Sequence, residues 1–335
     1  MEARLEVAET RRMEGAIKAA EAEILETTEG GYIETEGEME RTYKLTQGQI
    51  KEELDEQSAR QIYNLNLDQY SPYTANYTRD GRHLLLAGEG GHVALMDALT
   101  LTLQNELHLN ASNSTTSTQT AVKDSTFLHN SQLYALAETK SICIYDNNGT
   151  EIHNLMDHVS PLAVTFLPYH WLLASVGTAG YLKYTDTTTG SLVSQHRSKL
   201  GPCATMCYNP YNAVVHLGHS NGCVTLWSPN SSKNLVKMQC HRGTVTSVKV
   251  DLEGNYMVTG GVDGQVKVFD VRTYKLLHSY FSKTGVSSVD ISQTGVLAVG
   301  GGGHVTFWKD ALKEKQKSPY MHHGFKKGEQ VNTVR

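Results

Sequence analysis

The chain has 335 residues, a formal net charge of −5 and a hydrophobic fraction of 39%. This charge excludes a protein that binds nucleic acid through a general excess of cations. No apolar run approaches the ~18 residues of a membrane span, and no signal peptide opens the chain, so we expect an intracellular protein. None of the five cysteines belongs to a Cys-x-x-Cys pair, which predicts reduced core residues rather than zinc ligands.

Residues 1–60 form an acidic extension, with 16 acidic and eight basic side chains and a net charge of −8. Four apolar residues at helical spacing predict a helix over residues 2–27, which Gly30 and Gly31 end. These four residues are Met13, Ile17, Ala20 and Ile24. Because the apolar stripe is narrow, two interpretations stay open: a helix that binds a partner surface and a helix that is solvated on all sides.

A second helix is predicted to begin at Thr46 and to reach about Arg60. Thr46 and Gln49 have the spacing of a capping box, in which each side chain accepts a hydrogen bond from the other residue's backbone N–H. Leu45 and Ile50 flank this start as a hydrophobic staple. We therefore assign residues 1–60 to a helical N-terminal extension.

A repeat covers the chain from about residue 70 to residue 308. Each unit ends its third predicted strand with an aromatic residue, or a substitute, followed by a polar residue. The pairs are Met96-Asp97, Tyr145-Asp146, Thr185-Asp186, Trp227-Ser228, Phe269-Asp270 and Trp308-Lys309, spaced by 49, 40, 42, 42 and 39 residues. Units of about 40–45 residues with four short strands are typical of β-propeller blades. The one long interval contains a polar low-complexity run at 110–120, which predicts a surface loop.

These units predict an all-β fold, a propeller of six clear blades over residues 61–309. Alternating polarity over residues 62–67 predicts a further strand, a candidate for closing the ring by joining the last blade. Residues 310–335 are predicted to be a basic linker followed by the first strand of a seventh blade, because Val331–Val334 resembles the opening strand Val245–Val248. This interpretation implies that the intact protein continues beyond Arg335.

The unit around His241 carries the fullest set of polar blade residues, His241, Thr259 and Asp263, together with Phe269. This set resembles WD-repeat proteins, in which such residues form a hydrogen-bonded chain that ends on the aromatic ring. The network satisfies buried polar groups, and we predict a structural role rather than a catalytic His–Asp pair. Trp227 and Trp308 occupy the aromatic position of their own units.

The sequence predicts no catalytic residue, no metal site, no cofactor and no small-molecule substrate. Two glycine-rich runs, 88–91 and 300–303, lack the patterns of phosphate-binding loops and are interpreted as turns. Basic residues at blade tips and near the C-terminus are candidates for contacts to the RNA backbone, with a solvated cationic surface as the alternative. These residues are Lys183, Arg197, Lys199, Arg242, Lys326 and Lys327.

Several stretches resemble one family more closely than a general WD repeat. They are Gly37–Lys44, residues 71–97, residues 209–229, Cys240–Gly243 and Pro319–His322. On these stretches the chain is similar, over about residues 30–335, to the WD-repeat components of the small-subunit processome, which are associated with the U3 snoRNP. The resemblance implies a nucleolar protein of the nucleus, a scaffold needed for pre-rRNA processing and for maturation of small-subunit (18S) rRNA.

The resemblance also implies the partners. They are other processome proteins, including WD-repeat neighbours, bound through the N-terminal helices and the propeller faces, with pre-rRNA and snoRNA in the same particle and no membrane. The alternative is a general WD-repeat adaptor, such as a substrate receptor of a ubiquitin ligase. An enzyme built on a propeller would need clustered ligands or carboxylates near the central channel, which the repeat does not provide.

Overall fold

The structure is a computed structural model that describes residues 7, 10, 11, 13, 14, 33, 40–59, 65–67, 69–109, 120–325, 331 and 334. Its contacts divide the chain into Met1–Thr42 and Tyr43–Arg335. In the first unit the five described positions between residues 7 and 14 are helical, as predicted there. The remainder of the helix predicted over residues 2–27 lies outside the described residues.

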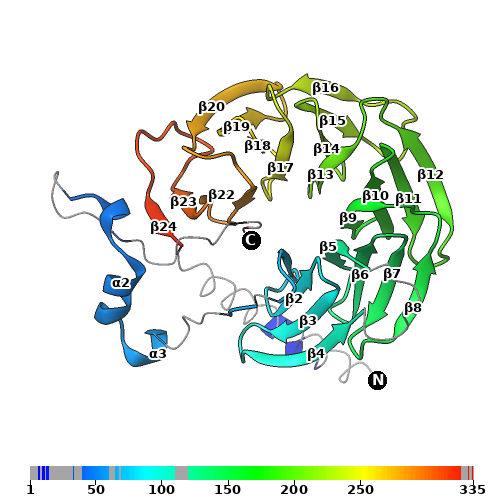
Figure 1. The fold of residues 1–335 in the computed structure, drawn as a ribbon, viewed down its shortest axis with the longest axis horizontal. Coiled ribbons are helices and arrows are strands. Elements are labelled where there is room, and N and C mark those ends of the chain that lie inside the picture. The colour runs from blue at the N-terminus through cyan, green and yellow to red at the C-terminus, as the bar shows by residue number, and fades with distance from the viewer. Residues whose placement is uncertain are drawn as a thin grey trace. The chain divides into compact units, whose positions relative to one another are not determined.

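The second unit contains six antiparallel four-stranded sheets, each built from four consecutive strands in sequence order (Figure 1). This arrangement confirms the predicted all-β propeller with six blades. The strands of blades 1 to 3 are β1–β4 (Tyr73–Tyr77, His83–Gly88, His92–Asp97, Thr102–His108), β5–β8 (Val122–Phe127, Leu133–Glu138, Ile142–Asp146, Glu151–Leu155) and β9–β12 (Pro161–Leu167, Leu172–Gly177, Tyr181–Asp186, Leu192–Arg197). Those of blades 4 to 6 are β13–β16 (Cys203–Tyr208, Val215–His219, Cys223–Trp227, Val236–Gln239), β17–β20 (Val245–Val250, Tyr256–Gly261, Gln265–Asp270, Lys275–Phe281) and β21–β24 (Ser288–Ile291, Leu297–Gly301, His304–Trp308, Met321–Gly324).

Position within the blade decides the polarity of a strand. The two middle strands are covered on both faces by neighbouring blades and therefore read as nearly continuous apolar runs; every residue of β14 and β15 is buried. The outermost strands β4 and β16 are mostly exposed or half-buried. The core lies between the blades, where Leu85 of β2 and Tyr134 of β6, for example, belong to one buried cluster.

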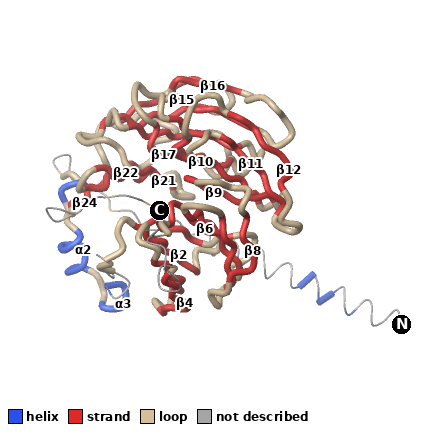
Figure 2. Tube along the Cα trace, turned by 45° about the vertical axis from the view of Figure 1, so that its right-hand side comes forward, coloured by secondary structure: helices blue, strands red, loops and turns tan. Residues whose placement is uncertain are grey.

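The blades are arranged around a central axis with β1, β5, β9, β13, β17 and β21 innermost. Each of these strands contacts the next one along the chain, and Figure 2 shows the same blades in an oblique view. Between blade 6 and blade 1, by contrast, lies a cavity of about 1090 Å³ lined by Leu84 and Tyr77 on one side and by Val305 and Phe307 on the other.

Among the described residues, six blades are present and a seventh is not. The run at 310–335, expected to be a linker, contains β24, which pairs with β23 and completes blade 6. The preceding loop places Ala311 and Leu312 in the core between blades 5 and 6. Of the strand predicted over 62–67, residues 62–64 lie outside the described part of the chain, and residues 65–67 are not in a strand.

The predicted capping box at Thr46 is present, with Thr46 and Gln49 bonded in both directions. The helix that follows is shorter than predicted: α2 spans Gln47–Glu53 and ends where Leu54 is extended, and α3 spans Glu56–Ala59. A 3-10 turn, η1, precedes them at Thr42–Lys44. α2 lies beside β24, because Gln47 Nε2 is 3.3 Å from Met321 Sδ.

Candidate interaction surface

His241 anchors the network predicted in blade 5. It is buried, its Nδ1 lies 3.0 Å from an oxygen of Asp263, and its Nε2 lies 2.9 Å from Thr259 Oγ1. Burial lowers the pKa of His241, against the opposing effect of Asp263. Phe269 is buried in the same blade and has no polar atom to join the chain. The four predicted residues therefore fix the turn between β18 and β19 and the strand that follows it.

Blades 3 and 4 carry versions of this network that the sequence pattern did not single out. In blade 3, His158 Nδ1 bonds Ser175 Oγ and its Nε2 lies 2.5 Å from Thr185 Oγ1. In blade 4, His219 Nε2 lies 2.7 Å from Thr225 Oγ1. Burial lowers the pKa of both imidazoles to about 4. They are therefore neutral at pH 7 and connect strands within their blades.

The two tryptophans named from the sequence occupy different surroundings. Trp227 is 3% exposed, donates from Nε1 to Thr225 Oγ1 at 2.9 Å and stacks on His196. Trp308 is half-buried and packs on Tyr280, with ring centroids 4.6 Å apart. Both rings lie against a neighbouring outer strand, which explains why an aromatic residue ends the third strand of these blades.

Four of the predicted RNA-contact residues lie on blades 3 and 4. Arg197 ends β12, Lys199 lies in the connection from β12 to β13, and Arg242 lies in the connection from β16 to β17; all three are exposed. These connections share one face of the propeller, here called the upper face, with the turns between the second and third strands. Lys326 and Lys327 lie outside the described residues.

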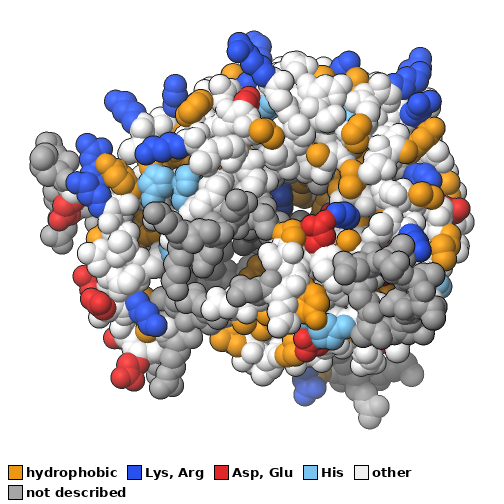
Figure 3. Space-filling view, viewed as in Figure 1, with side chains coloured by type: hydrophobic (Ala, Val, Ile, Leu, Met, Phe, Trp, Pro, Cys, Tyr) orange, Lys and Arg blue, Asp and Glu red, His pale blue; other side chains and the backbone are white. Residues whose placement is uncertain are grey.

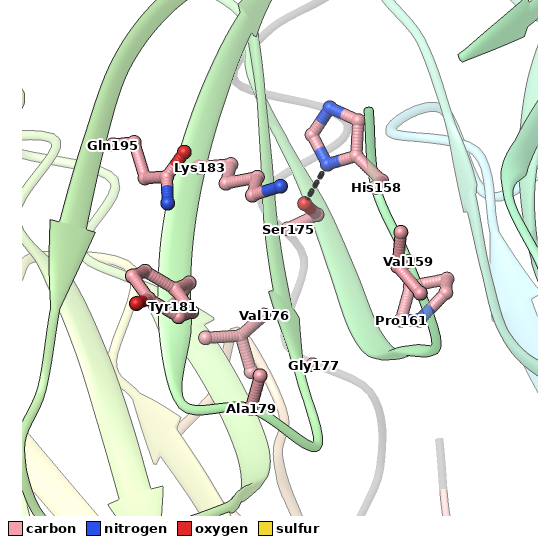
Figure 4. A pocket seen from close by; sticks show the side chains of 10 residues that line it. All are labelled: His158, Val159, Pro161, Ser175, Val176, Gly177, Ala179, Tyr181, Lys183 and Gln195. Atoms are coloured by element: carbon pink, nitrogen blue, oxygen red, sulfur yellow. Dashed lines mark hydrogen bonds between the residues drawn. The ribbon is translucent and has the colours of Figure 1, made fainter. Parts of the chain in front are cut away.

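Lys183 makes a hydrogen bond to the backbone that the sequence analysis did not predict. Its Nζ donates to the backbone oxygen of Asp157, and Lys267, at the equivalent position of blade 5, donates to the oxygen of Cys240 at 2.6 Å. Lys183 also lines a pocket of about 310 Å³ beside His158 and Gln195, and Figure 4 shows its side chain extending between them. The ammonium group thus supports the connection between blades and also faces a small surface pocket.

Two further cations extend this surface and were missed by the sequence analysis. Lys237 on β16 is exposed and close enough to His219 to lower the pKa of that imidazole. Lys283 is exposed in the connection from β20 to β21. The sequence alone gives no reason to select these two lysines, since neither belongs to the residue patterns that identify the blades. We call Arg197, Lys199, Lys237, Arg242 and Lys283 the upper strip.

Figure 3 shows Lys and Arg side chains along the rim between β20 and β12, and acidic side chains near α2 and α3.

The three most buried cysteine thiols are unreactive, because burial raises the pKa of Cys203 to about 11 and those of Cys143 and Cys240 to about 12. No helix within the described residues is long and apolar enough to cross a membrane.

Comparison with known proteins gives two kinds of match. The family model "WD domain, G-beta repeat" matches residues 232–270, which run from just before β16 to the end of β19 and include the His241 network. The chain is also 43% identical over 323 residues to "U3 small nucleolar RNA-associated protein 7" of Saccharomyces cerevisiae. It is 42% identical over 324 residues to "WD repeat-containing protein 46" of Homo sapiens and 37% identical over 313 residues to that of Caenorhabditis elegans.

These alignments cover 92%, 96% and 93% of the chain but only 57%, 52% and 52% of the yeast, human and nematode proteins. The chain thus spans about half the length of the curated relatives it matches. The similarity covers all six blades, whereas the WD family model matches one unit of the repeat.

Proposed function

We propose that this chain, a member of the WD-repeat family of U3 small nucleolar RNA-associated protein 7 and WD repeat-containing protein 46, is a non-enzymatic scaffold in ribosome biogenesis. The observation that carries the proposal is 42–43% identity over nearly the whole chain to these two proteins. In this role the propeller is a rigid body whose faces and rim hold other molecules. The protein acts in the nucleolus.

The finer proposal is a place in the small-subunit processome. There the chain supports pre-rRNA processing and maturation of small-subunit rRNA, in one particle with pre-rRNA, snoRNA and other WD-repeat proteins. The acidic extension of residues 1–60, with its net charge of −8, suits a basic protein surface better than RNA. The upper strip has the opposite charge and suits phosphate.

Affinity purification of the full-length tagged protein from growing cells tests this role. We expect a very large particle that contains pre-rRNA and a box C/D snoRNA. A small complex free of RNA would contradict the proposal and favour a general WD-repeat adaptor, such as a substrate receptor of a ubiquitin ligase. Sedimentation and sequencing of the bound RNA distinguish the two results.

We propose that the upper strip contacts the phosphate backbone of RNA. Arg197, Lys199 and Arg242 are exposed on neighbouring connections of one face, and cations that neutralise phosphates make affinity depend on salt. The logarithm of the affinity falls as the logarithm of the salt concentration rises. For single-stranded RNA, each lost phosphate contact makes this slope shallower by ~0.7. Replacing these three residues by Gln is therefore expected to make that slope shallower by about 2.

Arg79, Lys233 and Lys275 provide the matched control, since they are exposed on the opposite face of the propeller. Replacing them by Gln removes the same charge and is expected to leave a steeper salt dependence than the upper-strip variant. Equal slopes for the two variants would contradict the assignment of RNA to the upper face. Filter binding of a labelled single-stranded RNA at several salt concentrations provides the measurement.

We also propose that residues 331–334 open a seventh blade. Two contacts support this. Val331 N donates to Gly302 O at 2.8 Å, as Val286 N of blade 6 donates to Gly261 O at 3.2 Å. Val334 N donates to Ser288 Oγ at 3.1 Å, as Val289 N donates to Ser247 Oγ at 3.2 Å. Val331 and Val334 also line the cavity between blades 6 and 1, so the proposed first strand packs on the side of blade 6 that faces blade 1.

Val331→Asp tests the proposed first strand. Val331 is 8% exposed, and loss of its burial with introduction of an uncompensated charge is expected to cost about 2 kcal/mol or more of folding free energy. Thermal unfolding of the propeller provides the measurement. Val193→Asp is the control, because Val193 is exposed on β12; equal loss in both variants would contradict the seventh-blade contact.

A further inference from the structure

Three metal-binding side chains meet on the outer edge of blade 1. His92 begins β3, and the register of β3 with β4 places it directly opposite His108. Glu106 Oε1 lies 2.8 Å from His92 Nε2 and 3.5 Å from His108 Nε2, and the ligand atoms of all three residues lie within 4.8 Å of one another. We propose that His92, Glu106 and His108 bind a divalent transition-metal ion, with Zn²⁺ as the first candidate.

The spacing of the three groups fits tetrahedral coordination. Zn²⁺ binds imidazole nitrogen and carboxylate oxygen at ~2.0–2.2 Å, which places neighbouring ligand atoms about 3.3–3.5 Å apart. The two distances in the structure, 2.8 and 3.5 Å, require only a small opening between Glu106 and His92. Two imidazoles and one carboxylate are also the donor set of zinc sites with an open fourth position.

Two tyrosines hold the buried ligand in place. The Tyr73 hydroxyl lies 2.9 Å from His92 Nδ1, so it contacts the ring nitrogen that faces away from Glu106. Tyr70 stacks on His92 with ring centroids 5.3 Å apart and also contacts the ring of His108 at 5.6 Å. A partner on the second ring nitrogen fixes the tautomer and orientation of a metal-binding histidine, and Tyr73 is placed to do this.

Without metal, the same atoms form an ordinary hydrogen-bonded chain. Tyr73 O–H donates to His92 Nδ1, and His92 Nε2–H donates to Glu106. Metal binding would require the imidazole proton to lie on Nδ1 instead of Nε2. The Tyr73 oxygen would then accept a hydrogen bond from Nδ1–H, which a hydroxyl can do because it is both donor and acceptor. The Nε2 lone pair becomes the metal ligand, and no proton leaves His92.

The exposure of the site defines what it does. His92 is nearly buried, whereas the side chains of His108 and Glu106 are 44% and 45% exposed. The metal therefore links β3 to the outermost strand β4 and keeps a coordination position open toward solvent. Water, or a ligand atom from a bound protein, completes the coordination there. The proposed site therefore cross-links β3 and β4 at the edge of blade 1, and none of its ligands is a cysteine.

Titration of the tag-free chain with Zn²⁺ by calorimetry, and with Co²⁺ by visible absorption, tests the proposal. We expect one equivalent to bind and the thermal midpoint to rise. His108→Gln and Glu106→Gln each remove a ligand from an exposed position and are expected to weaken binding at least tenfold. Tyr73→Phe keeps all three ligands but removes the positioning hydroxyl and is expected to weaken binding about tenfold.

His322→Gln and His323→Gln are the controls, because both histidines lie on β24, in a different blade, and the ring of His322 lies 6.0 Å from that of His304. Circular dichroism establishes that each variant retains its sheets. Two results would overturn the proposal: no saturable binding up to about millimolar metal, or binding that survives in His108→Gln and Glu106→Gln but is lost in the β24 controls.

Discussion

Trp227→Ala is expected to lower the folding free energy of the propeller by about 3–5 kcal/mol, the usual cost of removing a large aromatic side chain from a core. Trp227 is 3% exposed and belongs to the cluster that joins blades 3 and 4 through Tyr184 and Leu217. Its removal leaves a cavity between the blades. It also removes the donor from Thr225, which lies buried beside it.

Trp171→Ala is the matched control for this change. Trp171 is 43% exposed and packs on His129 at the protein surface, so an effect below about 1.5 kcal/mol is expected from the lost ring contact. Chemical denaturation of both variants at pH 7.5 gives the comparison. Equal losses, or an unchanged midpoint for Trp227→Ala, would contradict the role of Trp227 as an inter-blade anchor.

The repeat was predictable because one local rule recurs in every blade. Middle strands are apolar on both faces, and a turn follows the pair that ends the third strand, so spacing and composition suffice to find them. Blade 6 follows this rule in its middle strands but has an unusually late fourth strand. Its fourth strand begins only at Met321, since the loop after Trp308 first inserts Ala311 and Leu312 beneath Tyr280. From the sequence alone, such a long basic segment cannot be distinguished from a linker between domains.

The surface chemistry was less predictable, because it depends on strand register. His92 and His108 are far apart in the sequence and show no metal-ligand spacing, yet the pairing of β3 with β4 places them opposite each other. Lys183 looked like a free cation and is instead bonded to a backbone oxygen of Asp157. Composition shows which groups are present, whereas only the register shows which of them meet.

Acidification from pH 7.5 to 5 is expected to destabilise the propeller strongly, with buried histidines as the cause. Burial lowers the pKa of His158, His216 and His219 to about 4, from the ordinary value of 6.5. Because the folded-state pKa is the lower one, the unfolded chain binds more protons between these values. The stabilisation from the neutral imidazoles is complete above about pH 6.5 and is lost as the pH falls toward 4.

The expected size of this loss follows from the same pKa difference. Each imidazole contributes at most about 2 kcal/mol of destabilisation at pH 5. Three such groups approach the whole stability of a typical domain, ~5–15 kcal/mol. Carboxylates differ in their effect: hydrogen bonds from Thr188 lower the pKa of Asp186 below its ordinary value of 3.8, whereas burial raises the pKa of Glu138. A raised folded-state pKa makes protonation favour the folded chain, so Glu138 opposes the loss caused by the buried histidines as the pH falls.

His216→Leu isolates one of these groups. His216 is fully buried, its Nδ1 faces the sulfur of Met257, and its Nε2 has no hydrogen-bond partner within the described part of the chain. Leucine has a similar volume and no proton to bind, so the loss of stability between pH 7.5 and 5.5 is expected to shrink by about 1.3 kcal/mol. Denaturation curves at the two pH values measure this difference. His153→Gln, at an exposed position on β8, is expected to leave the loss of stability between the two pH values unchanged. If both variants lose the same stability between pH 7.5 and 5.5, the acid sensitivity belongs to other groups.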